Sequence, residues 1–204
     1  MFHKKRPDGI LIENLPHFTR LLPYLMPDRT GSTIFVEKDF DVTDTLAWLK
    51  RFTRGLTPDR PKVTFFQVFL CAAVRAIALR PRMNRFVSGH RYWQRKRIAV
   101  NFVAKKELSD EGAEINVTIP FSLYETIHTL PGKVTETIRQ TIDSMSSGAD
   151  DTNAFLVKLP RWLLKLVFRL LKGLDYYNLL PASFMEELPF YGTIFLTNVG
   201  SVGI

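Results

Sequence analysis

The sequence predicts one mixed α/β domain, of the α+β two-layer type, spanning residues 1–204. Three observations support this fold class. The composition is globular, with 46% hydrophobic and 24% charged residues. Apolar residues recur with the period of a helix in some segments and with the period of a strand in others. No internal repeat or low-complexity linker divides the 204-residue chain, and this length suits one sizeable domain.

The first elements are expected before residue 60. Prolines punctuate residues 16–24, which predict a short helical or irregular entry. The apolar and β-branched residues of TIFVEKDFDV, residues 33–42, predict a strand. Thr43 or Asp44 can then cap a helix that ends at Gly55.

A buried helix and a series of strands are expected next. Thr64 can cap a helix that is apolar on nearly all sides and stops at Pro81. Its composition predicts a buried central element. Residues 85–94 predict a hairpin around Ser-Gly-His, and RIAVNFVAKK, residues 97–106, predicts an interior strand. EINVTIPF, residues 114–121, alternates apolar and polar residues as a half-buried strand does.

The last third predicts helices over roughly 124–146 and 153–173 and a final strand at 194–196. The final strand is apolar, so we expect it to be buried on both faces with partners on both sides. The helix at 153–173 is apolar except for a cationic stripe about 80° wide. The stripe consists of Lys158, Arg161, Lys165, Arg169 and Lys172. A buried interface within the domain or between subunits is favoured, and an anionic membrane surface is the alternative.

The positive charge is concentrated in one part of the chain. The formal net charge is +8, and residues 60–106 contain twelve Lys or Arg and no acidic residue. Such a block can meet nucleic acid, anionic lipid, an acidic protein or a phosphate-bearing cofactor, or it can be a solvated face. Nucleic acid is the weaker interpretation, because the aromatic residues among these cations fall in the predicted hairpin.

Residue types that often carry chemistry are sparse. Cys71 is the only cysteine, which predicts a buried structural thiol and a reducing, cytoplasmic location, with no span of eighteen apolar residues to cross a membrane. The histidines read as surface residues rather than bases; they are His3, His17, His90 and His128. There is no glycine-rich phosphate loop, metal-ligand spacing or nucleophile elbow.

Three segments in order resemble the catalytic domain of the dihydrolipoamide acyltransferases of 2-oxo acid dehydrogenase complexes. They are IFVEKDFDVTDTLAWLK (34–50), VTFFQVFLCAAVRAIALRPRMNRFV (63–87) and GTIFLTNVGSVGI (192–204). The resemblance implies the chloramphenicol acetyltransferase-like fold: a mixed sheet flanked by helices, with its C-terminal strands beyond this chain. It also implies trimers, or larger assemblies, with active sites between subunits. No lipoyl or subunit-binding domain is expected within residues 1–204.

In that family an acyl group moves between coenzyme A and a thiol or hydroxyl acceptor. The resemblance assigns Thr197 the hydroxyl that donates to the oxyanion. Asn198, Gly200 and Gly203 would shape the turn beside it, with Asn198 and Gly200 contacting coenzyme A. Coenzyme A is expected as a substrate rather than a resident cofactor, with its phosphates near the basic block.

The family's general base, a histidine in a His-x-x-x-Asp-Gly motif, has no counterpart in this sequence and is expected beyond residue 204. Residues 1–204 alone are therefore expected to be inactive. The helix at 153–173 is additional to the family's usual elements. The alternative is a non-catalytic assembly or membrane-surface protein that retains the fold.

Overall fold

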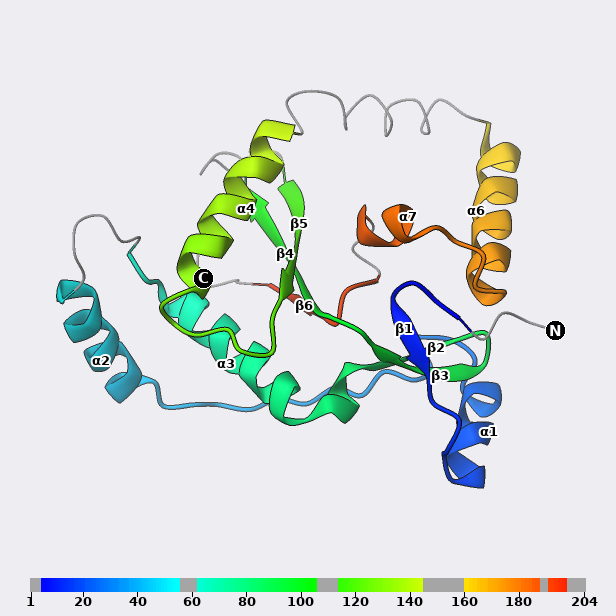
Figure 1. The fold of residues 1–204 in the computed structure, drawn as a ribbon, viewed down its shortest axis with the longest axis horizontal. Helices are drawn as coiled ribbons and strands as arrows, with labels where there is room; N and C mark the ends of the chain where they lie inside the picture. Colours follow the sequence, from blue (N-terminus) through cyan, green and yellow to red (C-terminus); the bar gives the residue numbers. More distant parts are fainter. Residues whose placement is uncertain (1–4, 56–61, 106–113, 145–159, 188–190, 198–204) are drawn as a thin grey trace.

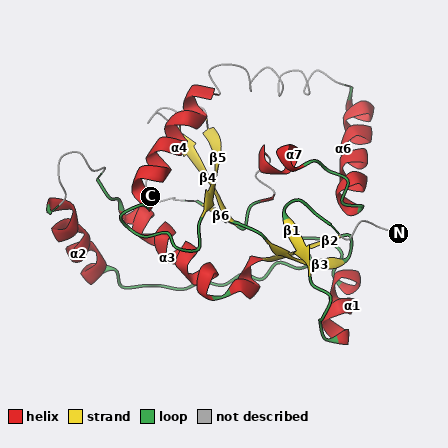
Figure 2. Ribbon diagram, viewed as in Figure 1, coloured by secondary structure: helices red, strands yellow, loops and turns green. Residues whose placement is uncertain are grey.

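The computed structural model describes residues 5–55, 62–105, 114–144, 160–187 and 191–197. Within them the chain forms a mixed α/β structure with six α-helices, one 3-10 helix and two three-stranded sheets (Figures 1 and 2). The mixed α/β class predicted from the sequence is confirmed.

The larger sheet is the centre of the structure and has the strand order β5-β4-β6. Its middle strand, β4 (Ile98–Lys105), pairs antiparallel with β5 (Glu114–Phe121) and parallel with β6 (Ile194–Leu196). In this register Val100 lies opposite both Ile119 and Ile194. The prediction that residues 97–106 form an interior strand is confirmed, because β4 has a neighbour on each side.

Two helices cover one face of this sheet and form the core with it. They are α3 (Phe65–Leu79) and α4 (Leu130–Ser144). Every second strand residue points at them, as the period of two in a strand requires. The core cluster consists of Leu70, Val74 and Ile77 of α3, Leu130 and Val134 of α4, and Ile98, Val100, Phe102, Val117, Ile119 and Phe121 of the strands.

The start of α3 is fixed by the capping residues that the sequence suggested. The Thr64 hydroxyl accepts from the Gln67 backbone N–H at 3.3 Å, and the Gln67 side chain accepts from the Thr64 N–H at 2.9 Å. This reciprocal pair satisfies two donors that the first turn of a helix otherwise leaves unpaired. The predicted burial holds for one side only, since Phe69 is 50% exposed.

The smaller sheet contains the predicted hairpin and has the order β1-β3-β2. Its strands are β1 (Gly9–Leu11), β2 (Arg85–Ser88) and β3 (Arg91–Arg95), all antiparallel. The 3-10 helix η1 (Pro81–Asn84) leads into β2. Gly89 and His90 form the turn with φ of 59° and 57°. Positive φ at both central residues is the signature of the tight type I′ hairpin turn.

The remaining helices lie around the two sheets (Figure 1). They are α1 (His17–Leu25), α2 (Thr43–Arg54), α6 (Arg161–Tyr176) and α7 (Ala182–Glu187). Within the described residues, α1, α2 and the C-terminal part of the helix predicted at 153–173 are confirmed. The capping prediction for α2 is wrong, because the residue before its first turn is Val42 and neither Thr43 nor Asp44 makes a side-chain cap hydrogen bond. Residues 153–159 lie outside the described part. The helix expected over 124–146 begins later, at Leu130.

Two strand predictions differ from the structure. Residues 33–42 are not a strand: they are extended but unpaired, and Ile34, Phe35 and Val36 are each at least 85% exposed. High strand propensity did not produce a strand there because no neighbour supplies the hydrogen bonds. The other difference is β6, which lies at a sheet edge with Phe195 49% exposed, rather than buried on both faces.

The predicted burial of the helix at 153–173 is wrong within the single chain. No described residue of α6 is buried. None of the described helices is long and apolar enough to cross a membrane.

Candidate functional site

The face of the larger sheet that α3 and α4 do not cover is polar. Asn101 of β4 lies opposite Thr118 of β5, and Asn116 lies opposite Val103. On the other side of β4, Asn101 lies opposite Phe195 of β6. Because strand residues alternate, none of these side chains belongs to the helix-covered core. We call this surface the polar face.

Thr197, the hydroxyl donor implied by the family resemblance, lies at one end of the polar face. It directly follows β6 and is exposed. The alternation of strand residues places it on the side of Phe195, and the pairing of Phe102 with Leu196 places it level with Val103. The structure therefore puts this hydroxyl next to Val103 of β4, with Asn116 of β5 on the far side of Val103. Asn198, Gly200 and Gly203 lie outside the described residues.

A cavity of about 250 Å³ opens at the other end of the polar face. Ala99, Thr118 and Pro120 of the larger sheet form one wall. The other walls are Pro7, Asp8, Arg95, Arg97, Ala182, Met185 and Tyr191. Val103 lies four positions after Ala99 on β4, which corresponds to roughly 13 Å along the strand. Between these two levels lies Asn101, which is buried and has Gly192 packed against its amide.

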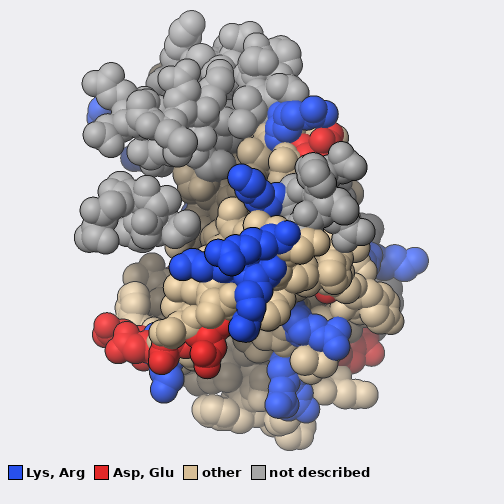
Figure 3. Space-filling view, turned by 90° about the vertical axis from the view of Figure 1, so that its left-hand side faces the viewer, with Lys and Arg blue, Asp and Glu red and all other residues tan. Residues whose placement is uncertain are grey.

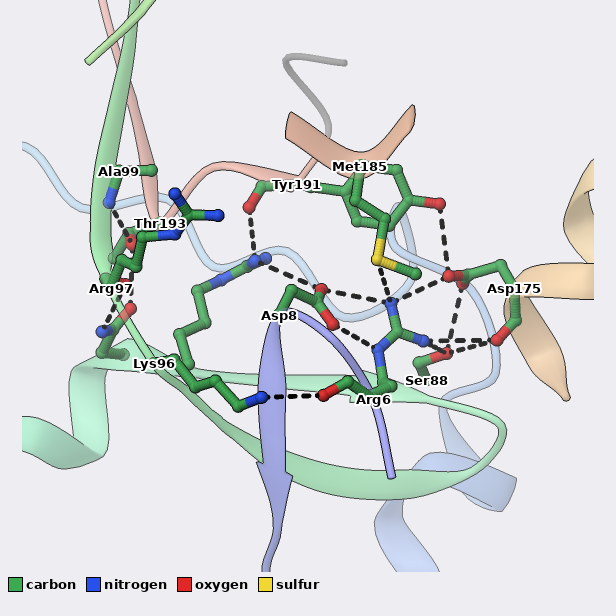
Figure 4. A network of polar contacts seen from close by, with 12 residues as sticks. Arg6, Asp8, Ser88, Lys96, Arg97, Ala99, Asp175, Met185, Tyr191 and Thr193 are labelled. Carbon is green, nitrogen blue, oxygen red and sulfur yellow. Dashed lines mark hydrogen bonds and ion pairs between the residues drawn. The ribbon is translucent and has the colours of Figure 1, made fainter. Parts of the chain in front are cut away.

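The cavity wall rests on a buried network centred on Arg6 (Figure 4). The side chain of Arg6 is 1% exposed. Its guanidinium donates to Asp8 at 2.7 Å, to Asp175 at 2.9 Å and to the Ser88 hydroxyl at 2.7 Å. The network joins the chain before β1, the hairpin and the last turn of α6. It thereby fixes three segments that are distant in sequence.

The electrostatics of the network keep its cation charged. Burial alone lowers the pKa of Arg6, but the hydrogen bonds and charges of Asp8 and Asp175 outweigh it and raise the pKa above its ordinary value. Arg95 lies 3.9 Å from Asp8 and donates to the Tyr191 carbonyl. Its pKa is lowered, chiefly because it is buried. Neither shift brings a guanidinium near the neutral form at physiological pH.

Tyr191 is the phenol of the cavity. Its hydroxyl donates to Asp175 at 3.2 Å. Burial raises the pKa of Tyr191 to about 12, and the nearby Asp175 carboxylate adds to the effect through its charge and this hydrogen bond. The phenol is therefore protonated at physiological pH and can donate a hydrogen bond but cannot act as a base.

A second group of polar contacts fixes the chain that leads into β6. The Thr193 hydroxyl donates to the Asn84 side-chain oxygen at 2.8 Å and accepts from the Ala99 N–H at 3.0 Å. Gly192 lies against the Asn101 amide so closely that an added Cβ would overlap it. This close approach requires glycine. The contacts set the position from which β6, and hence Thr197, continues.

The described histidines, the residue type that most often acts as a general base, lie away from the cavity. His128 is exposed and its ring lies 5.5 Å from that of Phe52. His90 stacks on Tyr24 at 4.5 Å, and with His17 it lines a different hollow, between α1 and β3. His3 lies outside the described residues. Asp8, the acidic residue of the cavity wall, is paired with Arg6. No described group of the cavity is placed to act as a general base.

The described residues contain no other reactive centre. Cys71 is half-buried and packs against the core cluster rather than lying fully inside it. Burial raises the pKa of its thiol, and the charge of Glu125 adds to the rise. The thiol is therefore a poor nucleophile. Nowhere in the described ranges do three or more His, Cys, Asp or Glu residues gather in a way that could hold a metal ion.

Sequence reasoning missed the Arg6 network and the Thr193 contacts. Arg6 meets Ser88 and Asp175 across 82 and 169 residues of chain, and Thr193 meets Asn84 across 109. The one available signal was local: Arg-Pro-Asp at residues 6–8 is a rigid turn with paired charges.

No protein-family model matches the sequence, and no curated protein matches it at a significant level.

Proposed function

We propose that this chain is part of a coenzyme A-dependent acyltransferase of the dihydrolipoamide acyltransferase type, with a chloramphenicol acetyltransferase-like fold. The acyl group would move between coenzyme A and a thiol or hydroxyl acceptor. The main support is the order of the three family-like segments along the chain. A mixed sheet with helices on one face, and Thr197 directly after its edge strand β6, is compatible with that fold.

The geometry supports separate roles for the two ends of the polar face. At the cavity end, the exposed Arg97 and the half-buried Arg95 provide positive charge. Guanidinium groups bind phosphate oxygens with paired hydrogen bonds, which suits the diphosphate of coenzyme A. At the other end, Thr197 would donate to the oxygen of the thioester as its negative charge develops.

In the proposed reaction the acceptor thiol or hydroxyl attacks the thioester carbonyl carbon. A tetrahedral oxyanion forms, the carbon–sulfur bond then breaks, and coenzyme A leaves as the thiol. The proton passes from the acceptor to the sulfur through a general base. We place that base beyond Ile204, since no described histidine lies at the polar face.

Coenzyme A binding to residues 1–204 tests the first role without requiring turnover. Titration calorimetry with Arg97→Ala should show affinity lower by about tenfold or more, since a hydrogen bond to a charged group contributes about 1.5–3 kcal/mol. Arg51→Ala, an exposed cation of α2, is the matched control and should bind as the wild type does. Equal affinity of the wild type and both variants for coenzyme A would show that Arg97 does not bind its phosphates.

Turnover tests the second role. Residues 1–204 should show no acyl transfer above background, whereas a form that continues past Ile204 through a His-x-x-x-Asp-Gly motif should be active. Turnover by residues 1–204 that disappears in His90→Ala or His128→Ala would place the base inside this chain and contradict the proposal.

A non-catalytic assembly protein with the same fold is the second candidate. One observation favours it: residues 33–42 expose three consecutive large apolar side chains, and strand-prone segments of this kind pair readily with other chains. An inert longer form that assembles through residues 33–42 would support this candidate against the enzyme.

A further inference from the structure

The helix α6 displays an exposed apolar row beside a row of cations. Trp162, Leu166 and Leu170 are 67%, 46% and 59% exposed. With 100° between successive residues, these three lie within about 80° of one another around the helix. The cations lie on the adjoining flank and are all exposed; they are Arg161, Lys165, Arg169 and Lys172.

The arrangement of α6 in the molecule leaves this row turned away from the protein. Leu164, Val167 and Leu171 are half-buried, and they lie on a different side of the helix from the exposed row. Figure 1 shows α6 at one end of the molecule, far from α3 and α4. The apolar row is therefore unpartnered within the described chain.

The last turn of α6 anchors the helix to the smaller sheet. Asp175 is bound by Arg6 and by the Ser88 hydroxyl, and Tyr176 packs edge-on to His90 at 5.6 Å. A Cβ at Gly89 would collide with the Tyr176 carbonyl oxygen, so the hairpin tip lies tightly against the helix end. The helix is thus held at one end, while its first three turns present the exposed row.

The charge of α6 favours an anionic occupant of this surface over an antiparallel second copy. Between Arg161 and Gly173 the helix has four cations and no acidic residue, and Asp175 is neutralised by Arg6. Antiparallel pairing with a second copy about a two-fold axis would bring the same flank together in both chains, cations against cations. An anionic surface has the complementary charge.

We propose that α6 binds an anionic lipid surface, with the Trp162–Leu166–Leu170 row entering the headgroup region and the cations meeting lipid phosphates and carboxylates. Interfacial helices combine these two features. Tryptophan and tyrosine also favour the membrane–water boundary, and α6 has Trp162 in its first turn and Tyr176 in its last. This inference stands independently of the acyltransferase proposal.

Positive charge alone does not distinguish α6, which provides a control. Figure 3 shows Lys and Arg gathered on the opposite side of the molecule, where α2 lies. On α2, Lys50 and Arg51 are exposed, but Leu49 is buried and Trp48 stacks on Phe52 at 4.9 Å. The α2 helix therefore lacks a continuous exposed row of the kind found on α6.

Vesicle flotation with the full chain is the direct test. The wild type should float with equimolar phosphatidylcholine–phosphatidylserine vesicles and stay in the buffer with pure phosphatidylcholine. Lys165→Glu plus Arg169→Glu should lower the partition coefficient at least about tenfold, because each cation near an anionic surface adds to binding. Lys50→Glu plus Arg51→Glu, the same charge change on α2, should leave it unchanged.

A second pair of measurements keeps the charge constant. Leu166→Ser plus Leu170→Ser should also weaken flotation, because insertion depends on buried apolar area. In a Trp48→Phe background, vesicles should shift the Trp162 emission to shorter wavelength, while Trp93, already fully buried, contributes a constant signal.

Three results would overturn the proposal. The first is a wild type that does not float with phosphatidylserine vesicles. The second is equal loss of flotation in the α2 control, which would indicate non-specific adsorption. The third is a wild type that is oligomeric in light scattering and does not bind vesicles, together with an α6 charge variant that is monomeric. This result would make α6 a subunit interface.

Discussion

The two faces of the β5-β4-β6 sheet come from alternate residues of the same strands, yet they differ in polarity and in what covers them. On one face Val100, Val117 and Ile119 are fully buried against α3 and α4. On the other, Thr118 lines the cavity, and Asn101, which lies opposite it, has its amide against Gly192. A strand can therefore stabilise a fold with one set of side chains and present chemistry with the other.

The difference between the two faces should have its largest effect on stability at two adjacent residues of β5. Ile119→Ala removes a side chain with 0% exposure, so the free energy of unfolding should fall by about 3 kcal/mol from lost burial and the cavity left behind. Thr118→Ala, one residue earlier on the polar face, should cost less than about 1 kcal/mol. Urea denaturation measures both free energies of unfolding. Equal losses would show that the two faces contribute equally to stability and would contradict the comparison.

The Arg6 network should have the next largest effect. Arg6→Gln leaves the carboxylates of Asp8 and Asp175 without their cation, which should lower the free energy of unfolding by roughly 2–3 kcal/mol. The figure is below that for a fully buried pair, because the two carboxylates are 14% and 29% exposed. Lys5→Gln, at the exposed neighbouring residue, is the control and should be nearly neutral.

A substitution at Gly192 tests the packing on the polar face itself. Gly192→Ala should destabilise the protein by about 1–3 kcal/mol, because the new methyl group must displace the buried Asn101 amide. Gly55→Ala, where the nearest atom to an added Cβ is 3.6 Å away, should change stability little. If Gly192→Ala unfolds at the wild-type denaturant concentration, the chain before β6 does not approach Asn101 of β4 as closely as described.

The smallest expected stability effect is a pH dependence from Tyr191. Its pKa is raised from 10.0 to about 12, so the folded state holds the phenol proton more tightly than the unfolded state does. The resulting stabilisation is fully present below pH 10 and is lost as the pH rises toward 12. Tyr191→Phe should therefore lose stability less steeply over this window. Tyr124→Phe, at an 82% exposed tyrosine, should follow the wild type.

Local signals in the sequence predicted local structure well. Thr64 with Gln67 three residues later marks a helix start, and Ser88-Gly89-His90 marks a hairpin turn, because a few neighbouring residues determine each. The interior position of β4 followed from its apolar residues on both faces. The exposed state of residues 33–42 did not follow, because strand propensity does not say whether a partner is adjacent.

The candidate site was predictable only in part, for a related reason. The resemblance identified Thr197 by a segment of contiguous residues. The cavity wall brings Asp8, Arg95 and Tyr191 together from three parts of the chain, and the pairing of Arg6 with Asp175 closes a loop of 169 residues. Such contacts depend on the tertiary fold and leave no periodic signal in the sequence.

The central proposal, that Thr197 at the end of the polar face stabilises an oxyanion, is tested most directly by steady-state kinetics of acyl transfer. The protein assayed is the longer form that this proposal requires, which carries a His-x-x-x-Asp-Gly motif after Ile204. Thr197→Val keeps the branched shape and removes the donor, so kcat should fall about 10²–10³-fold with KM nearly unchanged. Thr197→Ser keeps the donor and should retain most of the activity. Equal turnover by the wild type and Thr197→Val would contradict the proposal and leave Thr197 as an ordinary residue at a strand end.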